Sequence, residues 1–553
     1  MKIILLFAFF QINILLNHAA VYQTPNPDDK QYWHEYNINY LKNILKSQKP
    51  TKVAKNVILF VGDGMSFATI AAGRILKGQM QGKSGEETQV NFETFPHIGL
   101  SKTYNTNSQV PDSAATATAI FSGIKTTIRT IGLNNPTPNA KESERLKTII
   151  DWAQEKGKRT GLVTNTRICH ATPASAYAYS FHRDYECDTK VPNYIRSHFK
   201  DISRQLVENK PGKDLNVIFG GGKDFLGAHD IFEKNIVQFA GAGEVSCNRT
   251  DKQNLVEKYL RQFNNETVVK YVTNTGEMLG IDYDNVDHVL GLFANNHMEY
   301  ESLRNKNSDG QPSLTEMTKA AIRILNNKKN KNGYVLIVEG GKIDQAHHQN
   351  HARLALEEFV EFERAIQQAK DMTSSDETLI IVTADHAHSM IFNGYGKRGN
   401  DILGFGNTKK VNSQLYETIV YATGPGYLYH TKNDTDPTIS HMIPLEEYTE
   451  EQRGDALYMH QSMIPMYDSV HGGEDVGVFS DGPGSFLLQR TFEQCYIAYA
   501  ISFASCIGPA ADMNELCKSK PERLTSDSSS LKTSIGLTFL SVLFCSFKFI
   551  ASF

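Results

Sequence analysis

The stretch GYVLIVEGGKIDQAHH, residues 333–348, joins a continuous apolar run to a group of acids and histidines. Similar apolar runs of strand length occur as NVILFVG at 56–62, LNVIFGGG at 215–222 and ETLIIVTADH at 377–386. Helical patterns separate these runs, among them 143–157 and 352–370. Continuous apolar strands alternating with helices are typical of a parallel sheet that is covered on both faces. The sequence therefore predicts an α/β, doubly wound fold with a mostly parallel central sheet.

Residues 394–470 interrupt this alternation. They are rich in Gly, Asn, Thr and Tyr and show little helical periodicity. We expect them to form a small inserted, crown-like subdomain beside the main sheet.

The two ends of the chain carry export signals. Residues 1–20 contain Lys2, an apolar run and the small residues Ala19 and Ala20, which is the pattern of a signal peptide. Residues 526–553 contain SDSSS, a short spacer and the apolar run 535–547, which together indicate a GPI-attachment signal that is removed. The alternatives are a buried N-terminal helix and a C-terminal transmembrane helix, but the C-terminal run is well short of ~20 residues.

This pattern leaves 21–525 as the mature domain, attached within 526–530 to the extracellular face of the cell membrane. The formal net charge of −4 gives no basic footprint for nucleic acid, which we do not expect as a partner.

Cysteine usage agrees with export. Six cysteines remain when Cys545 is set aside with the C-terminal segment, and an even number in an oxidising compartment indicates disulfides. Cys506 and Cys517 are close enough in sequence to close a small loop, and we predict that pair; the other connectivity stays open. Three N-x-T sequons predict glycosylation sites, at Asn248, Asn265 and Asn433.

Metal-type ligands follow several of the predicted strands, where open α/β sheets bind their ligands. They are Asp63, Glu339, and Asp385 with His386; His471 lies in the loop HGGED, just before the strand-like run VGVF.

Asp344 and His348 are spaced i, i+4, so a helix after the glycines places both on one face. With a third histidine they have the composition of a zinc site that keeps an open position. A solvated surface helix is the alternative for this run alone.

A nucleophile candidate lies in VPDSAATATAIFSG. Pro111 and Asp112 indicate a helix start, which places Ser113 in the first turn. The positive end of the helix dipole would stabilise an alkoxide there. Plain helix capping is the alternative for an isolated Asp-Ser pair.

Six motifs now stand in one order: VILFVGDGM, VPDSAATATA, TRICHATPASAY, VEGGKIDQAHH, TADHAHS and VHGGEDV. In order and approximate spacing they resemble the animal-type, GPI-anchored alkaline phosphatases, over about residues 31–517. The resemblance implies two Zn²⁺ and one Mg²⁺ per subunit. The implied first zinc ligands are Asp344, His348 and His471. The implied second zinc ligands are Asp63, Asp385 and His386. The implied magnesium ligands are Asp63, Glu339 and Thr172.

The resemblance also implies the reaction. Phosphate monoesters are hydrolysed at alkaline pH through a phosphoserine on Ser113, while Arg183 in SFHRD clamps the phosphate and His170 lies behind the magnesium ligands. It further implies a homodimer, in which the aromatic segment 31–45 forms an arm around the partner and the insert 394–470 lies at the same interface.

At three places the sequence differs from the motifs of the family. The family's calcium motif GLFE reads GLFA here, with Ala294 in the acid's place and Asp309 nearby, which puts a calcium site in doubt. Gln345 stands where many relatives have a histidine. Cys187 and Cys247 do not match the family's other disulfide.

Other functions fit the same residues less well. A catalytically silent, GPI-anchored receptor or adhesion protein is the alternative from another class, since fold does not imply function. The intact set of Ser113, Arg183 and the ligands argues against it. PDSAAT fits neither a sulfatase motif nor a threonine nucleophile of phosphodiesterases, and Gly220–Gly222 lacks nucleotide-loop spacing.

Overall fold

The computed structural model describes residues 29–134, 136–230, 247–406, 415–432 and 441–518, of which those up to Cys517 belong to one unit. The predicted signal peptide 1–20, the sequon residue Asn433 and the predicted GPI signal 526–553 lie outside the described residues.

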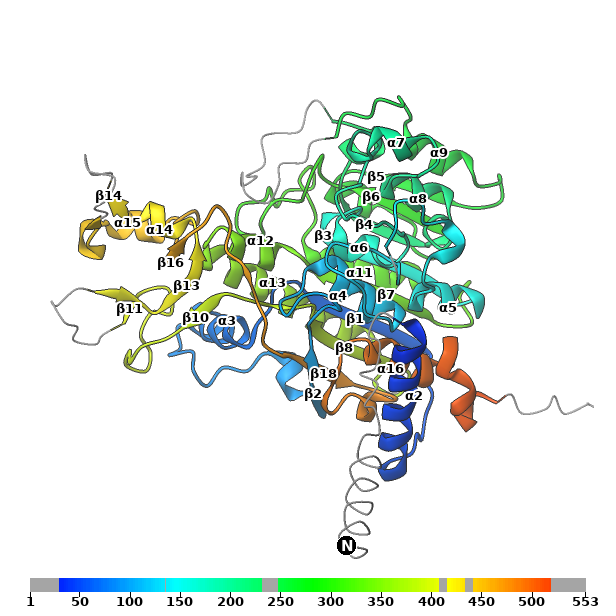
Figure 1. Cartoon of the computed structure of the whole chain (residues 1–553), viewed down its shortest axis with the longest axis horizontal. Helices are drawn as coiled ribbons and strands as arrows, with labels where there is room; N and C mark the ends of the chain where they lie inside the picture. The colour runs from blue at the N-terminus through cyan, green and yellow to red at the C-terminus, as the bar shows by residue number, and fades with distance from the viewer. Residues whose placement is uncertain (1–28, 135, 231–246, 407–414, 433–440, 519–553) are drawn as a thin grey trace, which may run out of the picture. The chain divides into compact units, whose positions relative to one another are not determined.

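One mixed sheet of ten strands organises this unit (Figure 1). Nine strands run in the same direction, and only β18 is antiparallel to its two neighbours. The fold class predicted from the sequence is confirmed. In spatial order the strands are β19 (Arg490–Glu493), β2 (His97–Lys102), β18 (Val476–Asp481), β8 (Thr378–Ala384), β1 (Asn56–Gly62), β7 (Tyr334–Gly340), β3 (Arg159–Arg167), β4 (Val217–Gly221), β6 (His288–Leu292) and β5 (Val269–Val272).

The central strand β1 shows why its sequence is apolar throughout. Val57 and Leu59 belong to one large buried cluster, whereas Ile58 and Phe60 belong to another. Successive side chains of a strand point to opposite faces, so both faces of the sheet are covered. One cluster contains residues of α4 (Ser113–Ser122), α5 (Ile149–Glu155) and α16 (Tyr496–Ser505); the other contains residues of α3 (Phe67–Gln79), α11 (Leu314–Leu325) and α13 (Ala352–Met372).

The helix expected over 143–157 is shorter than its pattern suggested. α5 begins only at Ile149, because the Thr148 side chain accepts from the Ile150 backbone and the Asp151 carboxylate accepts from the Thr148 backbone N–H. This capping box fixes the first turn there. The prediction for 352–370 agrees closely with α13.

The aromatic N-terminal segment forms α2 (Lys30–Ser47). Trp33, Asn37, Leu41 and Ile44 recur at helical spacing and are buried. The adjacent Tyr40 ring lies 4.6 Å from the ring of Tyr496 in α16 of the same chain.

The insert is built from short elements beside the end of the main sheet that carries α3 (Figure 1). Its three-stranded sheet has the order β10 (Met390–Phe392), β13 (Ile419–Gly424) and β16 (Ser462–Pro465). Two two-stranded pairs accompany it: β11 (Phe405–Gly406) with β12 (Tyr416–Glu417), and β14 (Thr431–Lys432) with β15 (His441–Met442). The sequence placed this region correctly as a departure from the strand–helix alternation.

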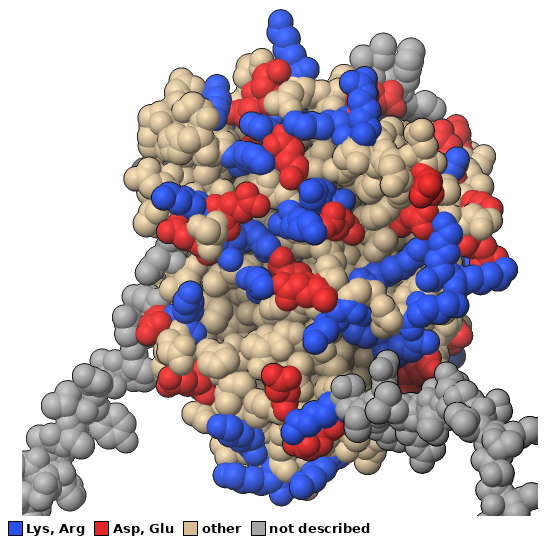
Figure 2. All heavy atoms as spheres, turned by 90° about the vertical axis from the view of Figure 1, so that its right-hand side faces the viewer, with Lys and Arg blue, Asp and Glu red and all other residues tan. Residues whose placement is uncertain are grey.

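Charged side chains of both signs are intermixed over the face shown in Figure 2. Within the described part of the chain, none of the helices combines the length and the apolar character needed to cross a bilayer.

Candidate active site

Acidic residues meet at the carboxyl ends of three central strands. The register pairs Gly62 of β1 with Gly340 of β7 and with Ala384 of β8. Asp63 and Asp385 therefore follow adjacent strands at the same level, two residues beyond the level of Glu339. All three carboxylates are buried.

The first cluster consists of Asp63, Asp385 and His386, whose ligand atoms lie within 4.8 Å of one another. His386 Nε2 is 3.3 Å from Asp63 Oδ1 and 3.2 Å from Asp385 Oδ2. The turn after Asp63 depends on Gly64, which has φ of +66° and where a Cβ would lie 2.9 Å from Asp344 Oδ1. A glycine is therefore required for the close approach to the neighbouring cluster.

The second cluster consists of Asp344, His348, His388 and His471. The helix α12 (Lys342–His348) places His348 Nε2 3.2 Å from Asp344 Oδ2, as the i, i+4 spacing predicted. His471 Nε2 lies 3.2 Å from His348 Nε2 and 3.6 Å from Asp344 Oδ1.

Backbone carbonyls fix the two ring tautomers. His348 Nδ1 donates to Ser469 O at 2.6 Å, and His471 Nδ1 donates to Pro111 O at 2.8 Å. Each Nε2 lone pair then points into the cluster, which is the usual arrangement of a metal-binding histidine.

His388 is a site residue that the sequence reasoning missed. Its Nδ1 accepts from the Ser389 backbone at 3.0 Å, so Nε2 carries the proton and faces Asp344 Oδ1 at 3.6 Å. His388 therefore lies beside Asp344, beyond hydrogen-bond distance, and offers no lone pair to the cluster. The signal was present in TADHAHS, because residues two apart in an extended segment share a face.

Glu339 and Thr172 belong to neither cluster among the described residues. Glu339 Oε2 accepts from the hydroxyls of Thr164 and Thr166, whereas Thr172 Oγ1 and Glu339 Oε1 are buried without a hydrogen-bond partner among the described residues. Thr172 lies in α6 (Ala171–Ala174), next to His170.

Ser113 is the first residue of α4, as predicted from Pro111 and Asp112. The Asp112 carboxylate caps the helix by accepting from the backbones of Ala114 and Ala115. Ser113 Oγ lies 3.0 Å from His386 Nε2 and 3.4 Å from Asp63 Oδ1. The Ser113 hydroxyl therefore lies both at the N-terminus of α4 and beside the first cluster.

A cavity of about 440 Å³ brings these groups together. Ser113, Arg183 and His170 line it beside His348 and His471. The Arg183 guanidinium is 3.1 Å from Asp112 Oδ2 and 3.1 Å from His170 Nε2. Further lining residues that the sequence did not single out are Ile128, Arg129, Arg167, Asp184, Glu186 and Asp468.

The buried carboxylates of the site need nearby positive charge to be stable as anions. Burial raises the pKa of Asp63 well above its ordinary value, and Asp385, Asp344 and Glu339 raise it further. Burial likewise raises the pKa of Glu339 to about 7. Crowded, desolvated carboxylates are stable as anions only beside positive charge.

The donor set fits metal ions. Asp63 Oδ2, Glu339 Oε1 and Asp344 Oδ1 are buried oxygens without a hydrogen-bond partner among the described residues. Buried polar atoms of this kind normally have partners. Mixed imidazole and carboxylate ligands suit zinc at both clusters, and the oxygens of Glu339 and Thr172 suit magnesium.

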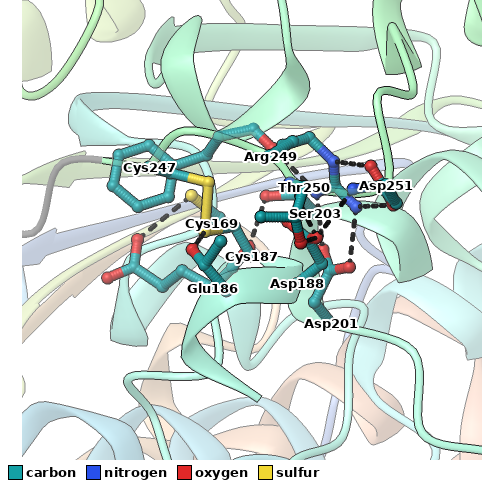
Figure 3. Close-up of a disulfide and its surroundings, with 12 residues drawn as sticks. Cys169, Glu186, Cys187, Asp188, Asp201, Ser203, Cys247, Arg249, Thr250 and Asp251 are labelled. Atoms are coloured by element: carbon teal, nitrogen blue, oxygen red, sulfur yellow. Dashed lines mark hydrogen bonds and ion pairs between the residues drawn. A yellow bond between two sulfur atoms is a disulfide. The ribbon is translucent and has the colours of Figure 1, made fainter. Parts of the chain in front are cut away.

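Two disulfides are present among the described residues. Cys506–Cys517 is a disulfide, and the pairing left open proves to be Cys187–Cys247 (Figure 3), while Cys169 and Cys495 are buried free thiols. Asn248 and Asn265 are exposed.

The doubtful calcium site gains no support from the described residues. Ala294 is buried, and Asp309 accepts a hydrogen bond from Asn305 and joins no metal-capable group.

Comparisons with known proteins agree with one family. The family model for alkaline phosphatase matches residues 54–507. Alkaline phosphatase 4 of Drosophila melanogaster is 47% identical over 509 residues, covering 90% of this chain and 85% of that protein. The tissue-nonspecific isozyme of Homo sapiens is 41% identical over 487 residues, covering 87% and 89%. A membrane-bound alkaline phosphatase of Bombyx mori is 37% identical over 466 residues, covering 82% and 81%.

Solved structures share the fold. The alkaline phosphatase of Thermus thermophilus aligns with a TM-score of 0.56 at 22% identity, covering 83% of this chain and 93% of that one. The enzyme of the Antarctic bacterium TAB5 aligns with a TM-score of 0.54 at 22% identity, covering 83% and 99%. A variant of the TAB5 enzyme is described with Mg bound in its M3 site.

Proposed function

The chain belongs to the alkaline phosphatase family and is a phosphate monoester hydrolase, and we propose that it acts through a phosphoserine on Ser113. One observation carries this proposal. Ser113 Oγ lies 3.0 Å from His386 Nε2 in a cavity that Arg183 also lines. The same cavity thus contains the proposed nucleophile, Ser113, and the proposed phosphate-binding residue, Arg183. Both ligand clusters lie beside it.

We assign the metal ligands as follows. Asp344, His348 and His471 would hold one zinc ion; Asp63, Asp385 and His386 would hold another; and Asp63, Glu339 and Thr172 would hold magnesium. Bound at these places, the ions supply positive charge to the entering and leaving oxygens of an in-line displacement.

The protein's own groups do the rest. The helix N-terminus at Ser113 favours its alkoxide, which attacks phosphorus as the alcohol leaves. Arg183 binds two phosphate oxygens in a fixed geometry because its guanidinium is planar. Water then cleaves the Ser113 phosphoester, and inorganic phosphate leaves. Asp112 and His170 hold the Arg183 side chain through both events.

The decisive experiment measures hydrolysis of p-nitrophenyl phosphate at alkaline pH before and after chelation. We expect activity to disappear on chelation and to return when zinc and magnesium are supplied together. Acid quenching with labelled phosphate, followed by peptide mapping, should find the label on Ser113. A folded protein that stays inactive with both metals present would support the silent, anchored binding protein instead.

We also propose a homodimer held to the extracellular face of the membrane by a GPI anchor. Exposed apolar side chains on β16 and just after it support self-association through the insert, namely Met463, Ile464, Met466 and Tyr467. The small-residue and apolar pattern of 526–553 supports the anchor. Sedimentation of the purified protein tests the dimer, and release from cells by a phosphatidylinositol-specific phospholipase C tests the anchor.

A further inference from the structure

The short segment from Arg183 to Asp188 is held by contacts at both of its ends, and Figure 3 shows its last residues, Glu186, Cys187 and Asp188, beside the disulfide. The Arg183 backbone N–H donates to Arg129 O at 2.8 Å. At the other end, the Asp188 carboxylate accepts from the backbones of Thr250 and Asp251, each at 2.9 Å. The segment that presents the proposed phosphate clamp is therefore fixed at both ends.

The disulfide Cys187–Cys247 adds a covalent tie beside Glu186. The residues after Cys247 are themselves well anchored, because the buried guanidinium of Arg249 binds Asp201 at 2.9 Å and contacts Asp251 at 2.6 Å. The disulfide thus connects the segment to a part of the chain that is held by buried ion pairs.

Glu186, next to the disulfide, connects this anchored segment to the residues that line the cavity. Its carboxylate is buried and accepts two hydrogen bonds from Arg167, from Nε at 2.8 Å and from a terminal nitrogen at 2.7 Å. The Cys169 thiol adds a third at 3.1 Å. Burial and the nearby Glu186 raise the pKa of Cys169, so its S–H remains a donor.

Arg167 and Glu186 line the same cavity as Ser113 and Arg183. Arg167 has little freedom to bind a ligand, because its other terminal nitrogen contacts Asn296 at 2.7 Å and the His297 ring at 2.6 Å. The Arg167 and Glu186 side chains are therefore fixed where they line the cavity. The contacts of the Arg183 guanidinium with Asp112 and His170 are longer, at 3.1 Å each.

We propose that Glu186 is a positioning residue: together with the Cys187–Cys247 disulfide, it fixes the backbone that carries Arg183 and so sets the affinity of the cavity for the phosphate dianion. This inference rests on the proposed function of Arg183. Preorganised groups bind more tightly because less freedom is lost when the ligand arrives. Loosening the segment should weaken phosphate binding while Ser113 and the ligand clusters stay in place.

The first test compares wild type with Glu186→Gln and with the double variant Cys187→Ser/Cys247→Ser, each saturated with zinc and magnesium. We expect KM for p-nitrophenyl phosphate and Ki for inorganic phosphate to rise on the order of tenfold, with a much smaller change in kcat. Cys506→Ser/Cys517→Ser is the matched control, since it removes the other disulfide. It should lower Tm and leave Ki unchanged. If the Cys187→Ser/Cys247→Ser variant fails to fold, the Ki of phosphate for Glu186→Gln alone tests the inference.

A second test separates positioning from general loosening. In an Arg183→Ala background, Glu186→Gln should change the Ki of phosphate by less than about twofold, because the two residues act through one contact with the ligand. Full multiplicative effects in that background overturn the inference, as does an unchanged Ki in the active Glu186→Gln and disulfide variants. A wild type that is inactive with both metals supplied overturns the proposed function instead.

Discussion

The imidazole rings of His386 and His471 stack with their centroids 3.6 Å apart, although His386 follows β8, His471 precedes β18, and the two belong to different clusters. The stack places the two ligand clusters next to each other. Two metal sites that act on one phosphoryl group must be close, at about 3.5–4 Å in enzymes of this kind. The contact between these rings is therefore the feature that makes the two clusters one active site.

Replacing the nucleophile is the most direct mutation. Ser113→Ala should lower kcat/KM for p-nitrophenyl phosphate by at least about a thousandfold, because the phosphoserine route is closed. Ser122→Ala, at the other end of α4, removes a hydrogen bond to Thr118 O and one from the Ile124 backbone, and should keep near-normal activity. Comparable rates for Ser113→Ala and wild type would remove Ser113 from the mechanism.

Removing His388 should weaken zinc binding without destroying the site. His388→Ala deletes the N–H that faces Asp344, and partners of metal ligands typically contribute about 10- to 100-fold in affinity. The free zinc concentration for half-maximal activity should rise by that factor, with activity recovered at high zinc. The exposed His198 offers the control variant His198→Ala. Equal zinc requirements in the two variants would contradict the assignment.

The insert contains a group that links stability to pH. Burial raises the pKa of Glu417 to about 8, against an ordinary value of 4.5. The folded state therefore holds a proton between these values that the unfolded chain releases, so the free energy of unfolding falls as pH rises from 4.5 through 8.

Glu417→Gln stays neutral and should avoid that loss. We expect the variant to match wild type in urea denaturation near pH 5 and to be more stable at pH 9. Glu446→Gln, at an exposed glutamate of the same insert, should behave like wild type at both values. A stability gap that is the same at pH 5 and pH 9 would show that Glu417 does not titrate in this way.

Docking of α2 depends on a buried polar contact. Asn37 Nδ2 donates to Gly123 O at 3.0 Å in a fully buried position. Asn37→Ala leaves that carbonyl without its partner and should lower the free energy of unfolding by about 1–3 kcal/mol. Asn43→Ala, on the exposed side of the same helix, should have almost no effect in the same denaturation series. Indistinguishable curves for the two variants would show that α2 contributes little.

The strand ends were predictable because their signal is local. An apolar run that ends in Asp63 or Asp385 shows both the buried strand and the unusual acid that follows it. Asp344 and His348 were equally visible, since one helical turn relates them. The capping of α4 by Asp112 likewise follows from adjacent residues.

Features that depend on distant pairing were not predictable. The sequence of β18 shows a buried strand but not that it runs antiparallel between β8 and β2, since both directions bury the same side chains. The pairing of Cys187 with Cys247 spans 60 residues and depends on how loops meet in space. The role of Glu186 was hidden for the same reason, because only the fold brings it to Arg167.

The position of β18 has a consequence for the order of events during synthesis. This strand lies between β2 and β8, which are made earlier, and His471 precedes it by a few residues. A nascent chain that ends before His471 has an open gap in its sheet and an incomplete second cluster. The second cluster is therefore complete only when nearly the whole catalytic body has left the ribosome, and we expect chains truncated in the insert to lack a working site.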